Sequence, residues 1–252
     1  MLDLRCKSKF FYPMSDLWNP WHGCHKISAG CLNCYVYRID SRIGRDPSTV
    51  VKTKSFNAPL RRNKSGDFCM SSGKIYTCFS SDFLIEEADQ WRADAWRIMR
   101  ERSSQNFIFI TKRIHRLKDC LPDDWGCGYP NVSIACTMEN QEMADFRMPI
   151  FLEAPIRHKF IVCEPLLSHI DFRGKLNNSA IEEIVAGGES GPDARICDFD
   201  WIKSIRLQCL ESKVNFHFKQ TGANFKKDGR IYKIPRNIQA KQARKSAMDL
   251  YF

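Results

Sequence analysis

The chain has 252 residues, of which 43% are hydrophobic and 27% charged, and its 39 basic and 29 acidic side chains give a formal charge of +10. These values indicate a globular protein with a sizeable core and exclude a disordered or fibrous chain. No apolar stretch approaches the roughly 20 residues that span a bilayer, and residues 1–7 lack the apolar segment of a signal peptide. We therefore expect a cytoplasmic protein without a membrane partner, whose twelve cysteines are candidate metal ligands rather than a disulfide framework.

The run from Trp18 to Tyr35 contains Cys24, Cys31 and Cys34 with the spacing C-x6-C-x2-C. Three thiolates are one short of the four that fully ligate an iron–sulfur cluster, and the remaining iron can then bind a small molecule. A glycine precedes each of the first two cysteines, which lets the backbone wrap closely around a bound group. This run therefore predicts an open metal centre.

Two other interpretations of the same loop stay open. A zinc site with three cysteines and one histidine would take His22 or His25 as its fourth ligand. A redox disulfide between Cys31 and Cys34 would need a thioredoxin-like context, which the surrounding sequence does not have.

Six short apolar runs follow, each rich in β-branched and aromatic residues, as is typical of strands buried on both faces of a parallel sheet. They are residues 75–79, 107–110, 132–136, 160–163, 184–186 and 214–218. An apolar stripe over residues 84–99 predicts one helix, and Asp198 is placed to cap another. The regular repeat predicts an α/β fold, a full or partial (β/α) TIM-type barrel of parallel strands, with an open doubly wound sheet as the alternative.

A charged residue follows each of the six apolar runs. The set is Asp82, Lys112, Glu139, Glu164, Glu189 and Lys219. In a barrel the carboxyl ends of the strands face the catalytic mouth, so we expect these side chains to lie around the site. Any one of them could instead cap a helix or form a structural ion pair.

Basic residues concentrate near the C-terminus, where eight basic side chains between residues 226 and 245 face one acid, Asp228. Such a segment attracts phosphate backbones, although it could also form a solvated helix. We therefore divide the chain into a barrel domain of residues 1–225, with the iron–sulfur loop at 18–35, and a basic extension of residues 226–252. DNA or RNA is the partner that the charge favours.

The cysteine run and six later blocks resemble the three-cysteine-motif family of phage and bacterial proteins, which is related to radical S-adenosylmethionine enzymes. The later blocks are Ser80–Leu84, Phe109–Arg113, Thr137–Gln141, Val162–Leu167, Gly187–Gly191 and Phe218–Gln220. The resemblance implies a radical-SAM-like barrel, a 4Fe–4S cluster held by Cys24, Cys31 and Cys34, S-adenosylmethionine as cofactor, and an electron donor as partner. The first cysteine gap is six residues here, where radical S-adenosylmethionine enzymes usually have three.

The reaction that the resemblance implies is reductive cleavage of S-adenosylmethionine to a 5′-deoxyadenosyl radical, which abstracts a hydrogen atom from a substrate. For cofactor contacts we expect Ser80, Ser81, Asp82, Lys112, Glu139, Glu164 and Glu189. For substrate contacts we expect Trp18, Trp21, Arg113, Lys219 and Gln220, although the two tryptophans could pack in the core instead. The alternative function is a zinc-containing nucleic-acid-binding protein without radical chemistry.

Overall fold

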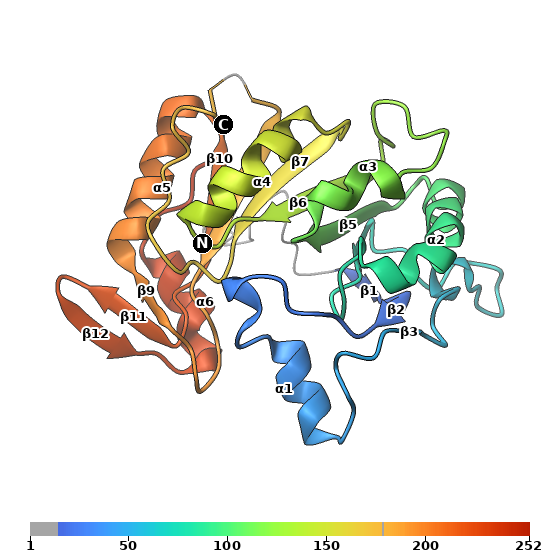
Figure 1. The fold of residues 1–252 in the computed structure, drawn as a ribbon, viewed down its shortest axis with the longest axis horizontal. Coiled ribbons are helices and arrows are strands. Elements are labelled where there is room, and N and C mark those ends of the chain that lie inside the picture. Colours follow the sequence, from blue (N-terminus) through green and yellow to red (C-terminus); the bar gives the residue numbers. More distant parts are fainter. Residues whose placement is uncertain (1–14, 178) are drawn as a thin grey trace.

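A curled, seven-stranded parallel sheet forms the centre of the protein (Figure 1). The structure is a computed structural model that describes residues 15–177 and 179–252. The strands lie side by side in the order β1 (Asp16–Trp18), β4 (Lys74–Thr77), β5 (Asn106–Thr111), β6 (Val132–Thr137), β7 (His158–Cys163), β8 (Ile181–Gly187) and β10 (Asn215–Gln220). This order follows the chain without reversing, which is the order of a barrel and not of a doubly wound sheet. Among the described residues no pairing joins β1 to β10, so the sheet is a half-barrel.

Helices flank this sheet, as the repeated strand and helix units predicted (Figure 1). They are α1 (Tyr35–Arg42), α2 (Asp89–Glu101), α3 (Leu117–Cys120), α4 (Gln141–Glu153), α5 (Phe199–Ser212) and α6 (Arg236–Lys245), with short 3₁₀ turns at Ala29–Cys31, Ala58–Leu60, Glu86–Ala88 and Ile114–Arg116. The predicted cap of α5 is confirmed, because the Asp198 side chain accepts a hydrogen bond from the Asp200 backbone N–H. None of the described helices is long and apolar enough to cross a membrane.

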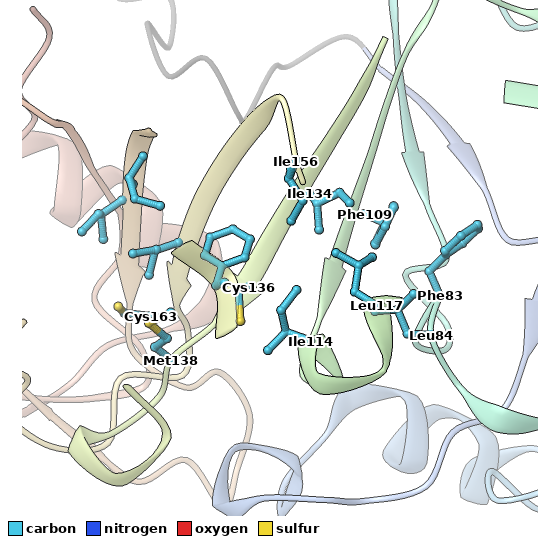
Figure 2. Close-up of a cluster of buried hydrophobic side chains, with 14 of the residues drawn as sticks. Phe83, Leu84, Phe109, Ile114, Leu117, Ile134, Cys136, Met138, Ile156 and Cys163 are labelled. Carbon is cyan, nitrogen blue, oxygen red and sulfur yellow. The ribbon is translucent and has the colours of Figure 1, made fainter. Parts of the chain in front are cut away.

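The central strands are mostly apolar because both of their faces are buried. Phe107 and Phe109 of β5 point into the large core beneath the helices, part of which Figure 2 shows. Ile108, between them, packs in a second, smaller cluster that includes Phe160 of β7 and Val185 of β8. The middle of the half-barrel is therefore mostly apolar, and the charged groups that line the cavity lie at or just after the carboxyl ends of the strands.

The basic C-terminal segment is part of this folded body. Two short sheets accompany the main one: β2 (Trp21–His22) pairs with β3 (Val51–Lys52), and β11 (Asn224–Lys227) pairs with both β9 (Ile196–Asp198) and β12 (Arg230–Lys233). Near the end of the chain, Leu250 exchanges backbone hydrogen bonds with Phe216 of β10. The predicted boundary between residues 225 and 226 thus falls inside strand β11.

Replacing Phe109 by alanine should lower the free energy of unfolding by about 3–5 kcal/mol, because the ring is fully buried and stacks on Phe83 at a centroid distance of 4.6 Å. Chemical denaturation measures this loss. Leu207→Ala on the exposed side of α5 is the control and should change stability by less than about 0.5 kcal/mol. Equal losses in the two variants would contradict the arrangement of the core.

Candidate functional site

A cavity of about 470 Å³ opens at the carboxyl end of the parallel strands, which is a volume typical of small-molecule sites. The cysteine loop, the turn after β4 and the ends of the later strands enclose it. Eleven of the predicted site residues line this cavity: Cys24, Cys31, Cys34, Ser81, Asp82, Lys112, Arg113, Glu164, Glu189, Lys219 and Gln220. The topology of the half-barrel therefore brings together residues that are up to 196 positions apart, from Cys24 to Gln220.

The three cysteines reach the cavity from one loop. Cys24 follows Gly23, which has a φ of +95° and lies so close to Thr49 that an added Cβ would be 2.2 Å from its carbonyl oxygen. Only glycine fits this position, so Gly23 fixes the start of the loop. Cys31 ends a 3₁₀ turn and Cys34 directly precedes α1. All three thiols are free and partly buried.

The buried carboxylate of Glu139, just after β6, holds the cysteine loop by hydrogen bonds. Its Oε1 accepts a hydrogen bond from the Gly30 backbone N–H at 3.2 Å and another from the Ser28 hydroxyl, while its Oε2 accepts one from Arg147 at 2.7 Å. Burial acts to raise the pKa of Glu139, but the charge of Arg147 and the hydrogen bond from Ser28 lower it by more. The pKa of Glu139 therefore lies below its ordinary value. Glu139 does not line the cavity, and its role in this geometry is to position the loop.

Glu189 holds the same loop from the other side. Two nitrogens of Arg195 donate to its carboxylate at 2.6 and 2.9 Å, and the Asn33 amide donates at 3.1 Å. Arg195 also donates to the Ala29 carbonyl at 2.8 Å. Burial acts to raise the pKa of Glu189, but the hydrogen bonds from Arg195 outweigh it and the pKa falls. Glu189 therefore couples the loop after β8 to the cysteine loop.

Asp82 connects the end of β5 to the first cysteine. It accepts hydrogen bonds from the Thr111 hydroxyl at 2.7 Å and the Lys112 backbone N–H at 2.9 Å, and it pairs with Arg113 at 3.4 Å. Arg113 in turn lies 3.7 Å from the Cys24 sulfur. Burial and Asp82 raise the pKa of Cys24 to about 12 despite Arg113, so this thiol holds its proton at neutral pH.

Two further groups face the cavity from the strand ends. Glu164 accepts hydrogen bonds from Lys219 at 2.5 Å and from the Gln220 amide at 2.7 Å, which fixes all three side chains. Lys112 donates to the Thr137 hydroxyl at 3.4 Å. Within residues 15–177 and 179–252, Lys112 has no carboxylate partner within 4.0 Å, so it is a cation available to a ligand.

The two tryptophans lie away from the cavity. Both are fully buried, and their indole N–H groups donate to the Phe56 carbonyl at 2.9 Å and the Asp82 carbonyl at 3.1 Å. Trp18 and Trp21 therefore pack in the core, which leaves no ring face open to a nucleobase. Ser80 also lies outside the cavity lining, with its backbone N–H bonded to the Asn19 side chain at 3.0 Å.

The histidines near the cysteines are engaged elsewhere. His22 bonds to Asp40 at 2.7 Å, and His25 bonds to Glu87. In the described part of the chain, no three His, Cys, Asp or Glu side chains converge on one point that could hold a single metal ion. The cysteines share the wall of a cavity without forming a closed tetrahedral site.

Sequence reasoning missed several residues that build this site. Arg147 and Arg195 neutralise the two loop-holding carboxylates, and Ser28 and Asn33 donate to them. Arg236, the first residue of α6, also lines the cavity. Asn33 and Ser28 stand inside the cysteine run and could have been found there, whereas no spacing marks the arginines.

Fold and site together define an α/β half-barrel protein whose strand ends and cysteine loop enclose a cavity lined by both charged and apolar side chains. The family model described as "Protein of unknown function (DUF5131)" matches residues 12–249, and the chain belongs to this family. No curated protein and no solved structure matches the chain. The match carries no statement about the three-cysteine motif or radical S-adenosylmethionine enzymes, so that relation stays a prediction.

Replacing Glu139 by glutamine should lower the free energy of unfolding by about 3–5 kcal/mol at pH 7, because it leaves the buried Arg147 without its counter-charge. The pKa of Glu139 in the folded protein lies below its ordinary value of 4.5. Its contribution is therefore present above pH 4.5 and lost as the pH falls below it. The difference between wild type and variant should shrink in that acidic range, as urea titrations at several pH values would measure.

Glu142→Gln, at an exposed position near the start of α4, is the matched control and should stay within about 0.5 kcal/mol of wild type. A Glu139→Gln protein as stable as this control at pH 7 would contradict the positioning role.

Proposed function

We propose that this protein is an iron–sulfur enzyme of the radical S-adenosylmethionine type. The observation that carries the proposal is the meeting of Cys24, Cys31 and Cys34 with charged strand ends in one cavity. Three cysteine ligands leave one iron of a 4Fe–4S cluster open to a small molecule. A cavity beside that iron is what a reaction on a bound cofactor needs, and a purely structural metal site would not need it.

The ligand arrangement supports a cluster better than a zinc ion. A structural zinc site needs four ligands at about 2.0–2.3 Å from a single ion. The described residues form no such group, and both nearby histidines are bonded to carboxylates. The ligands of a cluster bind different irons and need not converge on one point, so three thiols that line one cavity are compatible with a cluster.

The bound cluster would supply the electron that cleaves S-adenosylmethionine and so yield the 5′-deoxyadenosyl radical, while the protein supplies orientation and shielding. Lys112 would bind the carboxylate of the cofactor, because its ammonium group faces the cavity without a carboxylate partner among the described residues. Glu164, already fixed by Lys219 and Gln220, would accept hydrogen bonds from amino or hydroxyl groups. The apolar side chains of Ile110 and Val162 in the cavity wall exclude water from the reacting atoms.

Arg113 has a different task beside the cluster. Its guanidinium is almost fully buried and lies 3.7 Å from the Cys24 sulfur. A fixed cation at this position stabilises the thiolate form that a metal requires and offsets the desolvation that otherwise raises the pKa of Cys24.

Cys31→Ala should abolish the brown colour and the bound iron and sulfide of protein purified without oxygen, because two cysteines cannot retain the cluster. After chemical reduction, wild type should convert S-adenosylmethionine to 5′-deoxyadenosine, and the variant should lose at least about 100-fold of this rate. Cys127→Ala, at an exposed thiol outside the cavity, is the control and should keep both iron and rate.

The outcome that contradicts this proposal is a colourless wild-type protein with one zinc ion per chain. Iron-loaded protein that forms no more 5′-deoxyadenosine than Cys31→Ala would also overturn it.

A further inference from the structure

The cavity has an excess of positive charge. Each carboxylate that lines it is paired with a cation, in the pairs Asp82 with Arg113, Glu164 with Lys219, and Glu189 with Arg195. Two further cations, Lys112 and Arg236, also line the cavity. Over the described ranges neither has a carboxylate within 4.0 Å. Lys112 and Arg236 are therefore available to anionic groups of a ligand, such as a carboxylate or a phosphate.

Two arginines meet at the rim from opposite sides. Arg236 at the start of α6 donates to the Ser190 hydroxyl at 2.7 Å, and Arg38 of α1 approaches the Ser190 carbonyl at 3.5 Å. The next residue, Gly191, has a φ of +123°, and a Cβ built there would lie 2.0 Å from the Arg38 guanidinium. The glycine thus lets Arg38 lie against the loop after β8, where both guanidiniums bond to Ser190.

The positive charge continues beyond the rim onto the β11–β12 hairpin, which projects from the body of the protein (Figure 1). The hairpin begins four residues after the end of β10 and leads directly to Arg236. Every residue of β12 is exposed, including Arg230, Lys233 and the aromatic ring of Tyr232, which is 46% exposed. Exposed cations beside an aromatic ring are the combination by which proteins bind single-stranded nucleic acid.

We propose that the hairpin and the cavity rim bind the phosphate backbone of a single-stranded nucleic acid and lead one of its nucleotides to the cavity. A small anion would need only the cations of the cavity, whereas exposed cations on both faces of β12, Arg230 and Lys233, followed by Arg236 at the cavity, suit a polymer of phosphates. Enzymes that act on a nucleotide inside an enclosed site take it from a single strand or flip it out of the duplex. The idea that this nucleotide is the substrate rests on the proposed function. Binding of the strand to the hairpin and rim does not depend on the proposed function.

The test measures binding of a fluorescein-labelled DNA strand of about 20 nucleotides and of RNA of the same sequence, over a series of salt concentrations. Arg230→Gln with Lys233→Gln removes two phosphate contacts from a single-strand complex. Each contact contributes about 0.7 to the slope of log K against log salt, so the slope should flatten by about 1.4 and the affinity at 0.1 M salt should fall about 25-fold. Both side chains are exposed, so the melting temperature should not change.

The matched control is Arg157→Gln with Lys213→Gln, two exposed cations that precede β7 and β10 at the opposite end of the strands. This variant carries the same loss of charge and should bind like wild type. Equal weakening in both double variants would overturn the proposed surface, because net charge alone would explain it. Binding that ignores salt, absent binding of both strands, or tighter binding of the matching duplex would overturn it as well.

Failure of this inference and failure of the proposed function give different results. Cys31→Ala should bind the strand as wild type does, because the hairpin does not depend on the cluster. If wild type binds the strand with the expected slope but forms no 5′-deoxyadenosine, the surface stands and the radical chemistry fails. If 5′-deoxyadenosine forms but no strand binds, the proposed nucleic-acid surface is wrong. The substrate is then a protein or a small molecule instead of a nucleic acid.

Discussion

The position of the cysteine loop, and with it the geometry of the site, depends on the ion pair between Glu139 and Arg147. Between Gly23 and Ser28 the cysteine loop has no regular structure of its own, so its position depends on what it is bonded to. A carboxylate buried without a partner would be strongly destabilised, and Arg147 from α4 removes that cost. Once ionised and fixed, Glu139 bonds both to a hydroxyl and to a backbone N–H of the loop. The sheet thereby determines where the cysteines lie.

The same principle explains how charges are divided around the cavity. A parallel sheet buried on both faces places most of its polar groups at the strand ends, and there the carboxylates around the cavity pair with an arginine or lysine, as Asp82, Glu164 and Glu189 do. Glu139 and Glu189 are fully committed to holding the loop, while Glu164 faces the cavity with its partners already in place. Rigid pairs of this kind orient a ligand without reorganising, which is the property a reactive site needs.

Most of the fold could be predicted, because continuous apolar runs identify buried strands regardless of what surrounds them, and regular spacing gives their order. The roles within the site could not. Glu139 and Glu164 both follow a strand in the sequence. Glu139 pairs with Arg147 of α4 and holds the cysteine loop, whereas Glu164 lines the cavity, and the sequence does not show where Arg147 lies. The burial of Trp18 likewise depends on Phe56 and Phe107, which pack against it from distant parts of the chain.

A cluster bound by three thiolates would add negative charge to the cavity, and this charge would need compensation. Arg113 would supply part of it at Cys24, and Lys112 also lines the cavity. The cations at the rim are too exposed to act strongly on buried sulfur, since water and salt screen them. The exposed cations of the hairpin are better placed to meet a polyanion in solution, which is what the proposed nucleic-acid surface requires. A buried cation and an exposed cation therefore suit different ligands, even when they belong to one continuous stretch of positive charge.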